Sequence, residues 1–317
     1  MTSGTPENVR IEKRRSGLKF EETDDVIHWS NKSVAEQVFL DNFSCYLPLG
    51  ERFFVDSVRY FEDRIKNKKL KEEVKSFIYQ EAQHSLSHHN FNKVLFSKNK
   101  LARISELYIQ LLVLIARKVY SKRFQLSITA AAEHFTAVIS NWLLATADAF
   151  LSKNKSDVAS MWVWHAIEEI EHKSVAFDVF IEVTPNKYYA YILRVMGMLT
   201  ISMGLFPAIA INMTMVYLGG RNNRFKTKND QKVITPAGNI AESRRQPQNL
   251  IISKVINESN IAKQKRYSSI KFITLFISKT AKPYFVYYKY SFHPWQHDNS
   301  ALLNEVKAKF NFYPVVQ

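Results

Sequence analysis

The segment EAQHSLSHH, residues 81–89, places glutamate and histidine at helical spacing. Glu81 and His84 are three residues apart, and His88 follows four residues after His84. Residues three and four apart lie on one face of an α-helix, so these side chains share a face. Carboxylates and imidazoles are ligands of iron, manganese and zinc. The segment therefore predicts a metal-binding helix face.

The segment HAIEEIEH, residues 165–172, repeats this pattern. His165, Glu169 and His172 stand at positions i, i+4 and i+7, with Glu168 at the edge of the same face. Both segments contain Glu-x-x-His, and each adds one histidine on the same stripe, His88 in the first and His165 in the second. We expect Glu168 to support a ligand, and we keep the two extra histidines as candidates for ligands or for hydrogen-bond partners of ligands.

Each of these segments follows a stretch that carries an isolated glutamate among apolar residues. Glu51 lies in LGERFFVDSV and Glu133 in TAAAEHFTAVISNW. The order Glu, Glu-x-x-His, Glu, Glu-x-x-His supplies the four carboxylates and two imidazoles of a dinuclear carboxylate site in a four-helix bundle. Burying four carboxylates is costly unless cations hold them. We therefore expect two divalent metal ions, iron first and manganese or zinc as alternatives. The predicted ligands are Glu51, Glu81, His84, Glu133, Glu169 and His172.

The sequence predicts that the elements carrying these residues are all helices. Apolar residues recur at helical spacing over 33–46, 51–66, 70–96, 101–120, 126–151 and 157–183, with Pro48 and Gly50 expected to separate the first two helices. Only 8 Gly and 9 Pro occur in 317 residues, too few for a turn-rich β-sandwich or barrel. The predicted fold class is all-α, a ferritin-like helical bundle with an extra apolar helix and a basic C-terminal extension.

Five regions are expected along the chain. Residues 1–30 form a polar lead-in that we expect to be poorly ordered, and residues 31–185 form the bundle. Residues 186–220 form the apolar helix, residues 221–265 a basic polar linker, and residues 266–317 an aromatic and basic segment that packs on the bundle and ends in a short helix, 300–310. A single cysteine, Cys45, excludes intramolecular disulfides and multi-cysteine zinc sites.

Residues 195–220 carry no charge and are long enough to cross a bilayer. Three interpretations stay open: a membrane crossing, shallow attachment to a membrane surface helped by the basic residues that follow, and a helix buried in the bundle or in a homodimer interface. We expect a cytoplasmic protein, with inner-membrane association through residues 195–220 as a further option, because the N-terminus lacks the pattern of a secretory signal.

The net charge of +15 does not predict nucleic-acid binding. Fifteen Lys and Arg lie within residues 221–291 beside three acidic residues, so the excess is local and adjoins the apolar segment. No nucleic-acid-binding motif accompanies it. A lipid surface fits this arrangement better than a nucleic acid does.

Five separated runs of the sequence occur in the order found in a known family. They are PLGERFF, FIYQEAQHSLSHHNFN, TAAAEHFTA, MWVWHAIEEIEHKSVAFDV and FHPWQHDN. Together they resemble the bacterial family described as predicted metal-dependent hydrolases, over about residues 30–310. The resemblance implies a metal site at the six residues named above and, by the family's description, hydrolysis.

The ligand set itself favours a different reaction. Iron bound by four carboxylates and two histidines predicts an oxidoreductase that activates O2 and oxidises a small apolar or lipid-like substrate, with an electron donor as partner. A hydrolase that uses metal-activated water is the alternative. A non-catalytic metal-binding protein is the second alternative. Asp148 and Asp178 are candidates for orienting ligand imidazoles.

Overall fold

The computed structural model describes residues 4–23, 26, 29–30, 34–153, 156–230, 270–310 and 313–315. This part of the chain is an all-α helical bundle, as predicted, while the ferritin-like topology stays a prediction. An isolated antiparallel bridge joins Arg14 to Val315. The helices are α2 (Val34–Arg59), α3 (Lys68–Lys98), α4 (Ala102–Val119), α5 (Lys122–Leu144), α6 (Ala147–Lys153), α7 (Asp157–His172), α8 (Val175–Val183), α9 (Lys187–Asp230) and α11 (Ser300–Lys309).

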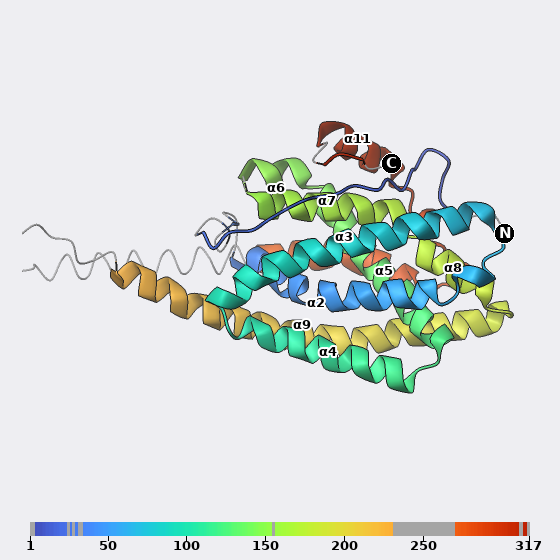
Figure 1. Ribbon diagram of the computed structural model, residues 1–317, viewed down its shortest axis with the longest axis horizontal. Coiled ribbons are helices and arrows are strands. Elements are labelled where there is room, and N and C mark those ends of the chain that lie inside the picture. The colour runs from blue at the N-terminus through green and yellow to red at the C-terminus, as the bar shows by residue number, and fades with distance from the viewer. Residues whose placement is uncertain are drawn as a thin grey trace, which may run out of the picture.

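Four helices form the part of the bundle that carries the predicted ligands. Helix α2 packs on α3 and α5, and α7 packs on the same two helices, so that each of the four touches two neighbours. Figure 1 shows α4 and α9 side by side along one edge of the bundle, with α6, α7 and α11 at the opposite edge. The interior between α2, α3, α5 and α7 is therefore shielded from solvent by further helices.

Helix α2 runs through Pro48, so the expected break between 33–46 and 51–66 is wrong. A proline inside a helix leaves the carbonyl four residues earlier without its N–H donor. Here that carbonyl belongs to Ser44, and the side-chain amide of Asn92 on α3 donates to it at 2.8 Å. A neighbouring helix thus supplies the donor that Pro48 lacks, and Glu51 is held on the same helix as Ser44.

Two other predicted helices each divide into two. The stretch 126–151 becomes α5 and α6, because the chain tightens after Leu144, where Thr146 N–H donates to the Leu143 carbonyl. The stretch 157–183 becomes α7 and α8, with a turn at Lys173 and Ser174. The Lys173 ammonium donates to the His297 carbonyl and to Asn299, which ties this turn to the C-terminal segment.

The N-terminal segment is packed on the bundle, contrary to the expected poor order of residues 1–30. In Figure 1 it runs as an extended chain across α3 and α7. The side chains of Thr5, Val9 and Arg14 are buried. Gly4 N–H donates to Asp178 on α8, and Ser16 hydrogen-bonds to Ser87 on α3. Residues 4–16 therefore form a strap over the outer side of these helices.

Helix α9 contains the predicted apolar segment. The part Lys187–Met215 contains an 18-residue stretch with a mean hydropathy of 1.7 and is long enough to cross a membrane, a property that the core helices of soluble proteins share. Residues 221–230 of the expected linker continue this helix, and residues 231–265 lie outside the described residues. Residues 270–286 are helical and are followed by a short turn of 3-10 helix, Pro294–Gln296, before α11.

Candidate metal centre

The structure brings all six predicted ligands together inside the bundle. Glu51 lies on α2, Glu81 and His84 on α3, Glu133 on α5, and Glu169 and His172 on α7; all six side chains are buried. The Nε2 atom of His172 lies 3.2 Å from Glu81 and 3.3 Å from Glu133. The Nδ1 atom of His84 lies 3.7 Å from both Glu81 and Glu169. Two of the three remaining candidates, Glu168 and His165, contact this cluster directly.

The cluster has two halves that share two carboxylates. Ligand atoms of Glu51, His84 and His165 lie within 4.8 Å of one another, and so do those of Glu81, Glu133 and His172. Glu81 also groups with His84 and Glu169 within the same distance. Glu169 in turn lies 3.7 Å from His172. Glu81 and Glu169 therefore stand between a half that contains Glu51 and a half that contains Glu133.

The outer hydrogen bonds of two histidines leave their inner nitrogens facing the cluster. The Nε2 atom of His84 bonds to Glu168 at 2.9 Å, so its Nδ1 faces inward without a hydrogen-bond partner. The Nδ1 atom of His172 donates to the side-chain oxygen Oε1 of Gln80 at 2.8 Å. Its Nε2 atom therefore faces inward without a hydrogen-bond partner. A carboxylate or amide on the outer nitrogen fixes the ring orientation of metal-binding histidines in this way.

The residue that supports each histidine comes from the opposite helix. Gln80 directly precedes Glu81 on α3 and supports His172, and Glu168 directly precedes Glu169 on α7 and supports His84. The expected supporting role of Asp148 and Asp178 is wrong, because Asp178 pairs with His293 and Asp148 with Lys309. Both aspartates point away from the cluster toward the C-terminal segment.

A third layer holds these supporting groups. Gln80 donates to Glu171 and to the Glu12 carbonyl, which fixes its amide orientation. The Arg14 guanidinium donates to Glu168 at 3.1 Å and to Glu171 at 2.8 Å. The charges of Glu168 and Glu171 are thus balanced by Arg14, together with Lys307 at 2.8 Å from Glu171. The strap and α11 therefore stabilise the cluster from outside.

A chain of hydrogen bonds sets the proton positions on the two extra histidines. Asn92 donates its amide to the Ser44 carbonyl and accepts from the Ser44 hydroxyl, so that hydroxyl must accept from His88 Nδ1 at 2.8 Å. His88 is neutral, since burial and the nearby His165 hold its pKa well below the usual range. Its Nε2 therefore accepts from His165 Nδ1 at 2.9 Å.

His165 consequently presents a lone pair to the cluster. Burial, together with the nearby His84, lowers the pKa of His165 to about 4, so the ring is neutral with its proton on Nδ1. The bare Nε2 lies 3.0 Å from a carboxylate oxygen of Glu169. Two lone pairs at this distance repel each other unless a cation lies beside them. Among the extra candidates, His165 fits a metal ligand, while His88 fits a supporting role one step further out.

The carboxylates of the cluster are buried and largely without hydrogen-bond partners, as expected for metal ligands. Both carboxylate oxygens of Glu51, Glu81 and Glu133 are buried without a hydrogen-bond partner, and Glu169 accepts from Thr136. Within the described residues, the ion pairs of Glu81, Glu133 and Glu169 are with histidines and not with lysine or arginine, and Glu51 makes no ion pair. Four buried negative charges match two divalent cations, and an uncompensated cluster of this kind would be strongly destabilising. The donor set therefore fits two divalent metal ions.

Without cations, protons take their place. Burial and the charges of Glu81 and Glu169 raise the pKa of Glu133 to about 8, and burial with the Glu81 charge raises that of Glu51 well above its usual range. Burial alone would lower the pKa of His84, but its hydrogen bond to Glu168 and the nearby negative charge of Glu81 outweigh burial and raise this pKa to about 10. Metal binding must therefore displace protons from these groups.

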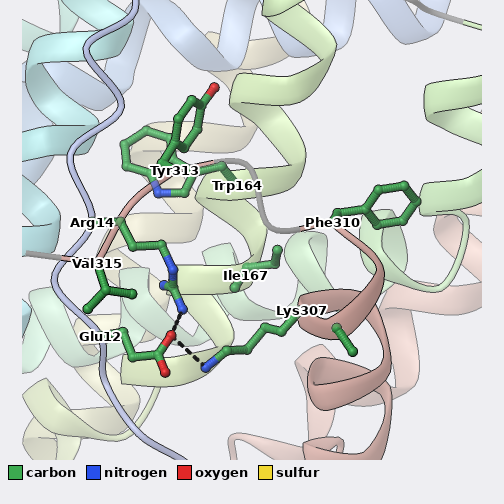
Figure 2. Close-up of a pocket in the computed structure, with 9 residues that line it drawn as sticks. Glu12, Arg14, Trp164, Ile167, Lys307, Phe310, Tyr313 and Val315 are labelled. Atoms are coloured by element: carbon green, nitrogen blue, oxygen red, sulfur yellow. Dashed lines mark hydrogen bonds and ion pairs between the residues drawn. The ribbon is translucent and has the colours of Figure 1, made fainter.

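A cavity of about 300 Å³ lies next to the cluster (Figure 2). Arg14, Lys307, Trp164 and Tyr313 are among the residues that line it. Two of them reach the cluster: Trp164 packs edge-on against the His84 ring at 5.0 Å between centroids, and Arg14 bonds to Glu168. The cations at its wall, Arg14 and Lys307, are paired with Glu12 and Glu171, and the lining as a whole exposes polar and apolar surface in equal parts.

Comparison with protein families gives a match over most of the chain. Residues 12–298 match the model of a family described as predicted metal-dependent hydrolase. The chain belongs to this family. The resemblance seen in the sequence motifs is thus confirmed, and the match includes the four helices of the cluster and the end of the strap from Glu12 onward. No curated protein matches this metal-dependent hydrolase family member, and no solved structure matches it.

Several residues of the site in this predicted metal-dependent hydrolase carry no recognisable signal in the sequence. Gln80, Ser44 and Asn92 act through hydrogen bonds to the histidines, and such residues occur on most helices. Arg14 lies in the polar segment that predicts no structure. Their positions depend on which helices become neighbours, which spacing along one helix does not reveal.

The raised pKa values predict how metal stabilises the protein as pH changes. A group whose pKa is raised on folding loses its stabilising effect as pH rises from its unfolded value to its folded value. For His84 this range is 6.5 to about 10 and for Glu133 it is 4.5 to about 8, so both contribute between pH 6.5 and 8. Each group should destabilise the metal-free protein by about 2 kcal/mol over this interval, or roughly 4 °C in Tm.

We therefore expect the difference in Tm between metal-loaded and metal-free protein to widen from pH 6.5 to 8 in differential scanning calorimetry. Burial lowers the pKa of Lys173, which acts in the opposite direction above pH 7, but Lys173 affects both forms equally and cancels in the difference. Parallel curves for the two forms would contradict the linkage.

Proposed function

We propose that this chain is a dinuclear metal-dependent hydrolase. Its ligands would be Glu51, Glu81, His84, Glu133, Glu169 and His172, and His165 would be a further ligand through Nε2. One observation carries the proposal: inward-facing metal-donor atoms of glutamate and histidine without hydrogen-bond partners gather in a buried cluster that no lysine or arginine of the described residues neutralises. When bound, a pair of divalent ions lowers the pKa of a coordinated water and stabilises charge on a leaving group.

The residues of the cluster would have different roles in binding the two metal ions. Glu81 and Glu169 lie between the two halves and would bridge them, while Glu51 with His84 and Glu133 with His172 would hold one side each. Glu168 and Gln80 hold the two imidazoles in the orientation that binding requires. Arg14 and Lys307 neutralise the acidic residues behind them. Zinc or manganese suits both this donor set and hydrolytic chemistry.

The family's description favours hydrolysis over oxidation. The oxygen-activating interpretation drawn from the ligand set has no support from the family match, and the hydrolase alternative fits its description better. The two activities make different demands: hydrolysis proceeds with redox-inert zinc, whereas oxygen activation requires a metal that changes oxidation state. Zinc-loaded protein therefore separates them.

The cavity beside Trp164 is the proposed substrate site. It shares Trp164 and Arg14 with the surroundings of His84, and the charged groups in its wall are already paired. Because its cations are paired and its lining is both polar and apolar, such a cavity favours an uncharged group with polar and apolar parts over an anion. We infer from this a small ester or amide with an apolar portion, in line with the apolar substrate expected from the sequence.

The first prediction for activity concerns the ligands. Zinc- or manganese-loaded protein should hydrolyse members of a panel of small esters and amides, and His84→Gln should lower both metal content and kcat/KM, the latter by more than about 100-fold. His89→Gln on the same helix is the matched control, because His89 is only partly buried and lies outside the cluster. Hydrolysis that survives in His84→Gln would contradict the proposal. Oxygen consumption by iron-loaded protein that is coupled to substrate oxidation would contradict it as well.

The second prediction concerns the cavity. Ala308 lies in its wall and its side chain is exposed, so Ala308→Trp should fill the cavity without disturbing the core. We expect kcat/KM to fall roughly tenfold while metal content stays unchanged. Ala301→Trp, on the same helix and also exposed, is the control and should behave as the unmodified protein. Equal activity of both variants would place the substrate elsewhere.

A further inference from the structure

Helix α4 turns an apolar stripe toward solvent. Ile104, Leu107, Leu111 and Leu114 follow one another at spacings of three and four residues and are all exposed, Leu107 to 58%. The opposite side of the helix carries Ala102, Ser105 and Ile109, which are buried. The solvent-facing side of this helix is therefore apolar over about three turns, where a surface helix usually carries polar residues.

Helix α9 carries a second stripe of the same kind. Ile192, Met196, Leu199, Met203 and Phe206 are exposed at spacings of three and four residues, Met203 to 76%. No charged residue interrupts the helix between Arg194 and residue 215. The helix over 270–286 adds a third stripe, in which Ile270, Ile273 and Ile277 are exposed. All three helices thus present apolar side chains to solvent.

These stripes belong to one face, because α9 lies between the other two helices. On one side, the Tyr108 hydroxyl of α4 donates to the Gly204 carbonyl of α9. On the other side, Ser202 of α9 hydrogen-bonds to Tyr284, and the Phe206 ring packs against Tyr284 at 5.8 Å between centroids. We call the outer side of α4, α9 and residues 270–286 the three-helix face. Soluble proteins rarely expose apolar surface over several helices in this way.

The inner side of α9 cannot leave the bundle without cost. Arg194 is buried and donates to the carbonyls of Tyr287 and Lys289. Gly197 lies so close to α5 that a Cβ there would be 2.7 Å from the Ser127 carbonyl oxygen. Met198 is also fully buried. The helix is therefore fixed lengthwise on the bundle, with only its outer stripe free for a partner.

The charges around the three-helix face indicate which partner fits. Residues 101–123, 187–215 and 270–290 contain eleven Lys and Arg and one acidic residue, Glu106. Lys118, Lys187, Lys279 and Lys282 are exposed. An apolar surface bordered by lysines is complementary to an anionic lipid bilayer, whose headgroups bind cations while its acyl chains take up apolar side chains. Two copies of this face would bring like charges together, which disfavours self-association.

We infer that the three-helix face docks on the surface of an anionic membrane, with α4, α9 and residues 270–286 lying in the plane of the interface. The chain would then be attached to one leaflet and would not cross the bilayer. This inference does not depend on the proposed hydrolysis, because it uses residues outside the metal centre and its test contains no substrate.

The test is co-sedimentation of the metal-loaded full chain with lipid vesicles. We expect binding to vesicles that contain phosphatidylglycerol, weaker binding to pure phosphatidylcholine, and a decrease with added salt. The double variant Leu107→Glu with Leu111→Glu should lower the partition coefficient by at least about tenfold. Leu86→Glu is the matched control: Leu86 is 53% exposed but lies on α3, which is not one of the three helices of the face, and its substitution should leave binding unchanged.

Thermal unfolding of the variants separates loss of binding from loss of fold, because all three leucines are exposed. Absence of vesicle binding by the unmodified protein would overturn the inference. Equal loss of binding in the double variant and in Leu86→Glu would also overturn it. A dimer in sedimentation equilibrium that the double variant dissociates, without vesicle binding, would show instead that the face joins two copies of the chain.

Discussion

Four carboxylates share one buried space in this protein, and their mutual repulsion is the constraint on which the rest of the site depends. Glu51, Glu81, Glu133 and Glu169 come from four helices, so the helices cannot pack unless something positive lies between these side chains. Protons meet this need only in part, as the raised pKa values of Glu51 and Glu133 indicate. Two divalent cations would meet it fully and would join the four helices.

The surroundings of the cluster separate two kinds of charge. Glu168 and Glu171 lie one step outside and are balanced by Arg14 and Lys307, which come from the strap and from α11. The inner four glutamates contact histidines whose outer nitrogens are held by Glu168, Gln80 and His88. The strap and α11, which lie near the two ends of the chain, thus help to keep the inward-facing nitrogens of the histidines available to bind metal. The cavity beside Trp164 lies where these outer elements meet, which is why the strap and α11 bear on both stability and substrate access.

The sequence predicts the centre of this site better than its edges. Glu-x-x-His occurs twice, and its spacing along a helix shows directly that each copy presents two possible metal donors on one face. The continuity of α2 through Pro48 could not be foreseen, since it depends on Asn92 from another helix. The same holds for Arg14, whose partner Glu168 is 154 residues away. The exposure of the apolar stripe on α4 could not be predicted either, because the spacing of apolar residues is the same whether a helix face is buried in the core or exposed to solvent.

The most direct test of the central claim is to locate the metals by anomalous X-ray scattering from crystals of the zinc- or manganese-loaded protein. For a dinuclear site we predict two peaks about 3.5–4 Å apart. One should lie beside Glu51 and His84 and the other beside Glu133 and His172, with Glu81 and Glu169 between them. A single peak in the cluster, or peaks only at other residues such as His293 and His297, would contradict it.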